Sequence, residues 1–267
     1  MLTNGDQKDN PMPPPAIIVF QNVSKVYQGD LFKKKKVALN GVSLEVRPGE
    51  IFGMIGRNGA GKSTAIKIIM GFVKHDSGHV MLASREPDKA ECHKGLGYLP
   101  ESPCLYQHLS ITDHLNCAAV IAGIPSPEIK PRIEQILQRV GLSQVSKIKI
   151  KKFSKGMTQR AALAYALLHA PDILILDEPM SGLDPFGRKL VVDIINDYRA
   201  QNKTVLFSSH VLTDVERLCD RIGVMNRGRM IKVMRPDEIP PSTGDHSKSP
   251  LEDIFMKLVN SDTGGKE

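Results

Sequence analysis

The clearest chemical signal in the sequence is a short glycine-rich segment, Gly56-Arg57-Asn58-Gly59-Ala60-Gly61-Lys62-Ser63-Thr64. It fits the pattern G-x-x-x-x-G-K-[ST] and follows the apolar run EIFGMI, with a helical pattern after it. Glycines let the backbone curl so that consecutive N–H groups face a phosphate, and the next helix N-terminus adds partial positive charge. Lys62 would then reach the terminal phosphates, and Ser63 would ligate Mg²⁺. The segment predicts a phosphate-binding loop, in preference to a plain glycine-rich turn.

Two adjacent carboxylates, Asp177 and Glu178, directly follow the apolar run ILIL at residues 173–176. A buried strand of a parallel sheet has this pattern, and its carboxyl end opens into the ligand crevice. We expect Asp177 to bind Mg²⁺, and Glu178 to orient or deprotonate an attacking water. In isolation the pair would be interpreted as two solvated carboxylates at a strand end. The phosphate loop favours the catalytic interpretation.

The elements that must position these groups follow from the spacing of apolar residues. Residues 16–99 carry short apolar runs between turn residues, which predicts a β-rich first third. Apolar positions at helical spacing then end at Gly141, a residue suited to a helix C-terminus, which predicts a helical insertion. From residue 157 helical and strand patterns alternate, as in a parallel sheet covered by helices. A hairpin signal at residues 226–228, a polar linker and an amphipathic helix complete the pattern.

Composition restricts the class of protein. The chain has 267 residues, 41% of them apolar and 24% charged, which is ordinary for a packed globular protein. No apolar run approaches the roughly 18 residues needed to span a bilayer, and the N-terminal lead lacks the order of a secretory signal. We therefore expect a cytosolic protein with reduced cysteines. The net charge of +7 suits a nucleotide, nucleic acid or an anionic membrane face equally.

The segment F-S-K-G-M-T-Q-R at residues 153–160 precedes the carboxylates and opens a helix. Together with the phosphate loop, it resembles the nucleotide-binding domain of ATP-binding cassette (ABC) transporters over roughly residues 17–233. The usual signature of that family is L-S-G-G-Q. The resemblance implies that Ser154 and Gly156 face the γ-phosphate of ATP held by a partner subunit. Lys155 and Met157 depart from the common form and are typical of exporter-type members with an S-K-G-M variant.

Further positions match the same family. The loop Ser181-Gly182-Leu183-Asp184 resembles the one through which two subunits sense each other, and His210 resembles the histidine that contacts the γ-phosphate. Tyr27 resembles the aromatic residue that stacks on adenine, with an exposed strand tyrosine, or Phe32 in its place, as the alternatives. Glu101 stands where the family usually has Gln. Its carboxylate can fill the same position in the Mg²⁺ shell, between the metal and the transmembrane partner.

The resemblance implies an α/β fold, in which a P-loop NTPase core carries an antiparallel β subdomain and an inserted helical subdomain near residues 102–160. The expected divisions are a flexible lead at 1–15, the ABC ATPase domain at 16–233, and a linker with a C-terminal helix at 234–267. ATP and Mg²⁺ would be the cofactors, and Lys62, Glu178 and His210 the catalytic residues. The expected partners are an identical second subunit and a separate transmembrane permease at the cytoplasmic face of the membrane.

The alternative is a soluble ABC-type ATPase that remodels ribosomes or nucleic acid. Translation-type members generally carry two cassettes and DNA-repair types carry long coiled-coil insertions, whereas this chain shows neither pattern. We therefore expect no nucleic acid partner. For the permease contact we expect exposed apolar anchors among Cys104, Leu105, Tyr106 and Leu109. The basic run at residues 33–36 is interpreted as a solvated loop, with contact to anionic lipid as the alternative.

Overall fold

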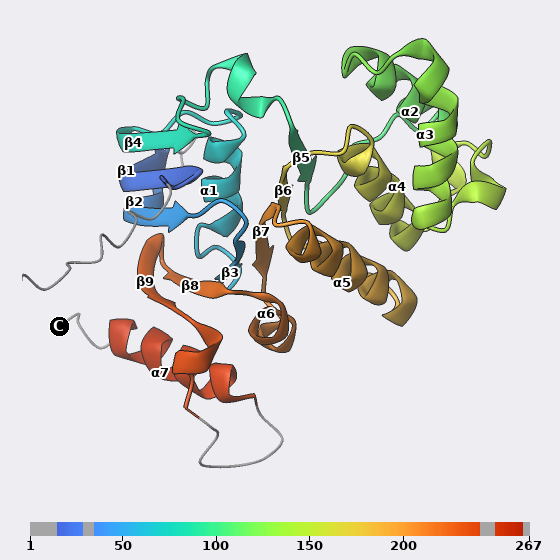
Figure 1. Cartoon of the computed structure of the whole chain (residues 1–267). Coiled ribbons are helices and arrows are strands. Elements are labelled where there is room, and N and C mark those ends of the chain that lie inside the picture. The colour runs from blue at the N-terminus through green and yellow to red at the C-terminus, as the bar shows by residue number, and fades with distance from the viewer. Residues whose placement is uncertain (1–14, 29–34, 241–248, 264–267) are drawn as a thin grey trace, which may run out of the picture.

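The computed structural model describes residues 15–28, 35–240 and 249–263, which form two sheets with helices around them (Figure 1). The smaller sheet is antiparallel, with strand order β2-β1-β4. The larger sheet has the order β5-β6-β7-β3-β8-β9. The expected mixture of an antiparallel region and a parallel α/β core is confirmed.

The antiparallel sheet consists of β1 (Ile18–Tyr27), β2 (Lys36–Val46) and β4 (Ser77–Leu82). Apolar side chains on its inner face, such as Phe20 and Leu44, are buried against α1 (Lys62–Ile69) and share one core with it. Alternation of buried and exposed residues along β1 and β2 reflects a sheet with one face on the core and one face in solvent.

The parallel sheet is built around β3 (Ile51–Ile55), which pairs with β7 (Thr204–Ser209) on one side and β8 (Arg221–Asn226) on the other. Beyond β7 lie β6 (Ile173–Leu176) and β5 (Leu96–Leu99), and β9 (Arg229–Met234) adds an antiparallel edge to β8. Every residue of β3, β6 and β7 is buried, because helices cover both faces of the sheet.

The β-rich first third that the sequence predicts is divided between the two sheets. Its strands β1, β2 and β4 form the antiparallel sheet, whereas β3 and β5 join the parallel one. β3 becomes a central strand there, because it is apolar at all five positions and can be buried on both faces. The phosphate-loop segment therefore starts from the middle of the main core.

Helices between β5 and β6 form a cluster at one end of the molecule (Figure 1). α2 (Ile111–Ile121) begins at a capping box, in which Ser110 and Asp113 satisfy each other's backbone N–H groups. α3 (Ser126–Arg139) follows the predicted helical spacing, and Gly141 just beyond it has a left-handed φ of +66°. α4 (Lys155–Leu167) leads back to the parallel sheet and packs on β5.

The helices of the C-terminal part of the chain pack on the larger sheet. They are α5 (Pro185–Ala200), α6 (Leu212–Leu218) and α7 (Pro250–Thr263), with short 3₁₀ turns at Ala90–His93, Ser143–Val145, Ile150–Lys152 and Pro236–Glu238. α7 buries Leu251, Phe255 and Val259, spaced four residues apart, against α6 and β8. Within the described part of the chain, no helix combines the length and apolarity that crossing a bilayer requires.

The hairpin between β8 and β9 is hydrogen-bonded to the phosphate loop through Gly228. Gly228 donates its N–H to the carbonyl of Ala60 at 2.9 Å and accepts the N–H of Asn40 at 2.7 Å. Arg227 and Gly228 both have positive φ, 45° and 79°, as a tight hairpin turn requires. A β-carbon on Gly228 would lie 2.8 Å from the carbonyl oxygen of Ala38, so there is also no room for a side chain at this position.

We expect Gly228→Ala to lower the free energy of unfolding by about 2 kcal/mol, because left-handed strain and a backbone clash add together. The matched control is Gly123→Ala, since Gly123 has a φ of +71° but no atom within 4 Å of the added carbon. Strain alone should cost about 1 kcal/mol there. Urea unfolding of both variants measures the two free energies of unfolding. Equal losses of stability would contradict a clash between the added carbon and the Ala38 carbonyl.

Candidate functional site

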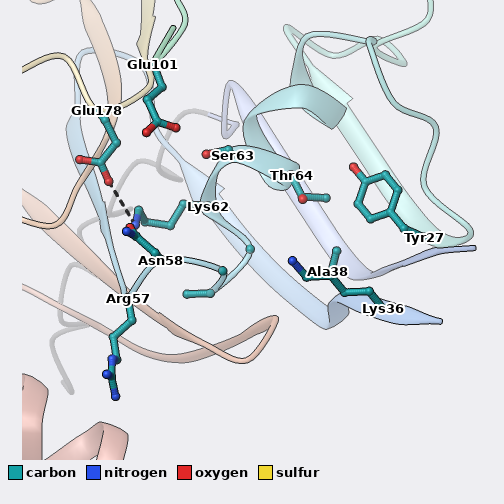
Figure 2. A pocket seen from close by; sticks show the side chains of 13 residues that line it. Tyr27, Lys36, Ala38, Arg57, Asn58, Lys62, Ser63, Thr64, Glu101 and Glu178 are labelled. Carbon is teal, nitrogen blue, oxygen red and sulfur yellow. Dashed lines mark ion pairs between the residues drawn. The ribbon is translucent and has the colours of Figure 1, made fainter. Parts of the chain in front are cut away.

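A cavity of about 360 Å³ opens where the phosphate-loop segment meets the ends of the neighbouring strands (Figure 2). Its wall brings together residues from five separate parts of the chain. They are Tyr27, Lys36, Ala38, Arg57, Asn58, Gly59, Ala60, Gly61, Lys62, Ser63, Thr64, Glu101 and Glu178. Eleven of these thirteen, all except Lys36 and Ala38, belong to the residues that the sequence predicts for the nucleotide site.

The loop from β3 to α1 owes its shape to its glycines. Gly61 has a φ of +111°, and a β-carbon there would lie 2.7 Å from the carbonyl oxygen of Ala38. A β-carbon on Gly56 would lie 2.5 Å from the carbonyl oxygen of Met225. Larger residues would push the loop away from the strands beneath it. The loop leads directly into the N-terminus of α1, whose unpaired N–H groups favour an anion.

Lys62 is the buried cation of the site, with a relative exposure of 5%. Its ammonium donates to the carbonyl oxygen of Gly56 at 2.7 Å and lies 3.2 Å from Oε1 of Glu178. Glu178 is almost equally buried, at 6%. The predicted phosphate-binding lysine and the predicted catalytic carboxylate therefore form an ion pair across the pocket, drawn as a dashed line in Figure 2.

His210 completes this group from the loop that follows β7. Its Nδ1 lies 2.7 Å from Oε2 of Glu178, and its backbone N–H donates to the same oxygen at 3.2 Å. Glu178 itself has a φ of +50°, an uncommon conformation for a residue with a β-carbon. All three residues predicted to be catalytic, Lys62, Glu178 and His210, thus meet at one carboxylate.

Oxygen donors suited to Mg²⁺ gather beside this group. Ser63 Oγ donates to Asp177 Oδ1 at 3.2 Å, and the carboxylate of Glu101 points into the same space (Figure 2). A hydroxyl and one or two carboxylates are what Mg²⁺ uses in phosphate sites, where phosphate oxygens and waters supply its other ligands. The three residues predicted as metal ligands, Ser63, Asp177 and Glu101, therefore have the right chemistry and a common location.

Ser208, which the sequence analysis did not single out, links the two carboxylate residues. Its hydroxyl donates to Asp177 Oδ1 at 2.6 Å and accepts the backbone N–H of Glu178 at 2.8 Å. The side chain is fully buried in β7. The signal in the sequence is a serine within the apolar strand TVLFSS, because a buried hydroxyl must find a partner.

Tyr27 lies at the opposite end of the pocket from Glu178, with 37% of its surface exposed (Figure 2). Lys36 and Ala38 on β2 also line the pocket, although the sequence analysis assigned them no such role. Lys36 is the first residue of β2, so it does not belong to the loop that the sequence predicts for residues 33–36. Phe32, Lys33 and Lys34 lie outside the described residues.

Six predicted site residues lie outside the pocket lining. Gly56, Asp177 and His210 each bond a residue that lines it. The other three are Ser154, Gly156 and Asp184. Ser154 is the exposed N-cap of α4, where its Oγ accepts the N–H of Met157 at 3.2 Å. Asp184 is the N-cap of α5 and accepts the N–H of Gly187 at 2.7 Å. The segment containing Ser154 also touches the loop of Asp184, since a β-carbon on Gly182 would lie 2.8 Å from Cε of Lys155.

A second hollow of about 280 Å³ lies beyond Glu101, lined by Tyr98, Pro100, Pro103, Cys104, Leu105, Tyr106, His114, Ala162 and Tyr165. Tyr106 is 76% exposed and stacks on His114, with ring centroids 5.9 Å apart. Leu109 is 37% exposed, whereas Leu105 is partly buried and packs against the core. Among the expected apolar anchors, Tyr106 and Leu109 are therefore more exposed than Leu105. Burial, with the Asp177 carboxylate adding to it, raises the pKa of Tyr98 to about 12, so its phenol stays neutral.

Comparison with known proteins agrees with this geometry. Residues 39–181 match the family described as ABC transporter. An uncharacterised ABC transporter ATP-binding protein of Nostoc sp. is 39% identical over 84% of this chain and 68% of the relative. The lantibiotic transport ATP-binding protein SrtF of Streptococcus pyogenes is 37% identical over 80% of this chain and 89% of the relative.

Among solved structures, one described as the ATP-binding subunit of an ABC transporter matches with a TM-score of 0.78 and 30% identity. The match covers 91% of this chain and 99% of that one. The family match, the relatives and the pocket all point to the same chemistry. The protein belongs to the ABC transporter family, as an ATP-binding and ATP-hydrolysing subunit.

Proposed function

We propose that the protein hydrolyses MgATP in a site shared by two copies of the chain, and that hydrolysis drives a separate transmembrane permease at the cytoplasmic face of the membrane. The observation that carries this proposal is the meeting of Lys62, Glu178 and His210 beside Ser63 and Asp177. A phosphate loop alone would support binding. A buried carboxylate next to that loop supports hydrolysis as well.

The ion pair between Lys62 and Glu178 suggests how binding prepares hydrolysis. A nucleotide phosphate carries more negative charge than one carboxylate, so it attracts the Lys62 ammonium away from Glu178. Glu178 then keeps its contact with His210 and is free to accept a proton from water. The water oxygen attacks the γ-phosphorus, the bond to the β,γ-bridging oxygen breaks, and ADP leaves with the bonding electron pair.

The charge that develops on the phosphate during this step is stabilised by fixed groups. Lys62 and the N-terminus of α1 supply positive charge on one side. Ser63 and Asp177, with Glu101 nearby, are the residues that would hold Mg²⁺, which neutralises phosphate charge when it is bound. We propose Tyr27 and Lys36 as contacts at the nucleoside end, because both line the far part of the pocket.

We propose that the second copy of the chain completes the site with residues that do not line the pocket of their own chain. Ser154 is exposed at the start of α4, and Asp184 is at the start of α5. We propose that both, together with Gly156, face the ATP of the partner copy. Contact between Lys155 and Gly182 supports this arrangement, since it ties the signature segment and the Asp184 loop into one surface.

The hollow beside Glu101 is our proposed contact with the permease. It combines exposed aromatic surface at Tyr106 with a position next to the nucleotide site. α2, within the proposed helical subdomain at residues 102–160, lines the hollow with His114, and α3 packs against α2 (Figure 1). An apolar helix from a membrane chain is the kind of partner that such a groove accepts. The S-K-G-M signature supports export as the direction of transport.

Glu178→Gln should bind ATP normally and lose most of its turnover, because the water loses its base while every phosphate contact remains. The expected fall in kcat is about 10²–10⁴-fold. Phosphate release measures turnover, and size-exclusion chromatography with MgATP should show an accumulated dimer. Glu134→Gln on the exposed face of α3 is the matched control for the change of charge. Normal turnover by Glu178→Gln would remove this residue from the role.

Asp184 offers a test of the shared site, because substitutions can remove the charge of its side chain with or without its helix-capping hydrogen bond. Asp184→Asn keeps an acceptor for the N–H of Gly187, so stability in urea should stay within about 0.5 kcal/mol of the wild type. Asp184→Ala loses the cap and should cost about 1 kcal/mol. We expect reduced ATP hydrolysis from the Asn variant despite its stability. Full activity in that variant would leave Asp184 with the capping role alone.

Tyr106→Ala combined with Leu109→Ala should release the protein from membranes that contain its permease, because exposed interfacial anchors each contribute up to a few kcal/mol of binding. ATP binding should be unaffected. Met256→Ala, which removes an apolar side chain of 51% exposure from α7, is the control and should stay on the membrane. Sedimentation of membranes gives the measurement. Full retention of the double variant, or sedimentation of the wild type with ribosomes, would contradict the proposed contact.

A further inference from the structure

We infer that Ser208 is a positioning residue that sets the orientation of both carboxylates of the site. Its single hydroxyl donates to Asp177 Oδ1 at 2.6 Å and accepts the N–H of Glu178 at 2.8 Å. It is fully buried, so no water competes for these two bonds. The inference rests on the proposed roles of Asp177 and Glu178, and it adds a residue on a different strand that makes those roles possible.

Strand register explains why this position can reach both groups. β6 and β7 are parallel neighbours, with Leu176 opposite Phe207 at the last pair. Ser208 is the next residue along β7, and Asp177 is the next residue after β6. Strands in a sheet lie about 4.8 Å apart, so only a short side chain fits between the two backbones. Serine is short and carries both a donor and an acceptor on one atom.

The bond to the Glu178 N–H holds a strained part of the chain. Glu178 has a φ of +50°, which a residue with a β-carbon adopts rarely unless its surroundings hold it. This conformation directs the side chain to Lys62 and His210. Loss of the Ser208 acceptor leaves the N–H without its partner, and the turn can then relax towards ordinary backbone angles. The carboxylate would move away from the water that it should activate.

The bond to Asp177 restricts the second carboxylate. Ser208 and Ser63 both donate to Oδ1, at 2.6 and 3.2 Å. Together they hold the carboxylate in one orientation beside Ser63, which is also a proposed Mg²⁺ ligand. Removal of one hydroxyl lets the carboxylate rotate. Outer partners of this kind commonly change metal affinity by 10–100-fold when they are mutated.

The test compares Ser208→Ala with Ser209→Ala in the full-length protein. Ser209 is the adjacent residue on the same strand, but its Oγ bonds the backbone N–H and carbonyl of Val211 and not the carboxylates. Ser208→Thr keeps the hydroxyl and should retain most of the wild-type behaviour. Ser208→Cys keeps the size but has a weak donor, and it should behave like Ser208→Ala.

The first readout needs no nucleotide, metal or catalysis. Hydrogen–deuterium exchange of the Glu178 amide should become about tenfold faster in Ser208→Ala and stay unchanged in Ser209→Ala. The second readout is kinetic. In Ser208→Ala, kcat should fall at least about tenfold and the half-saturating Mg²⁺ concentration should rise about tenfold. Binding of a fluorescent ATP analogue in EDTA should stay within twofold of the wild type, because the phosphate loop is untouched.

The inference is overturned if folded Ser208→Ala keeps the exchange rate, kcat and Mg²⁺ dependence within twofold of the wild type, or if Ser209→Ala changes them equally. Should Ser208→Ala fail to fold, the same comparison applies to Ser208→Cys and Ser208→Thr, and equal behaviour of these two overturns it. Glu178→Gln separates this result from the proposed function. Loss of turnover in Glu178→Gln with a normal Ser208→Ala refutes only the role of Ser208, whereas normal turnover in Glu178→Gln refutes the proposed base.

Discussion

The buried ion pair between Lys62 and Glu178 is the interaction on which the site depends. Both side chains are less than a tenth exposed, so each charge has given up most of its hydration. Such a pair is tolerable only when further polar groups support it. The carbonyl of Gly56 supports the ammonium, and His210 supports the carboxylate. The site thus holds one ammonium and one carboxylate in contact, and we propose that a nucleotide phosphate separates them.

The order of strands in the larger sheet makes this pair possible. β6, β7 and β3 are adjacent, and their carboxyl ends carry Asp177 and Glu178, His210 and the phosphate loop. Parallel strands place these ends on one edge, where backbone groups and helix N-termini face the ligand. Ser208 joins two of the strands at this edge through its hydroxyl. The geometry of the site is therefore a property of the sheet as much as of any single loop.

The contacts that we propose with other chains lie outside the pocket. The N-terminal ends of α4 and α5 carry Ser154 and Asp184, which cap their helices and stay outside the pocket. The hollow around Tyr106 lies past Glu101, so a chain bound there would be next to a proposed metal ligand. Pro100 lines this hollow and its neighbour Glu101 lines the phosphate pocket, so the two hollows adjoin along the chain. We propose that this adjacency couples transport to hydrolysis.

Sequence alone determined the phosphate loop, the carboxylate pair, the alternation of helices and strands in the second half, and the family. These features depend on local conformation, because glycine spacing, helix periodicity and strand-end carboxylates are read within a few residues. Only tertiary structure decided that β3 and β5 leave the first β region for the parallel sheet, that Lys36 lines the pocket, and that Leu105 packs inward. Tertiary structure alone also decided the ion pair of Lys62 with Glu178 and the two hydrogen bonds of Ser208. Each joins segments at least 30 residues apart, and the order in which the strands pair, which no local pattern specifies, brings them together.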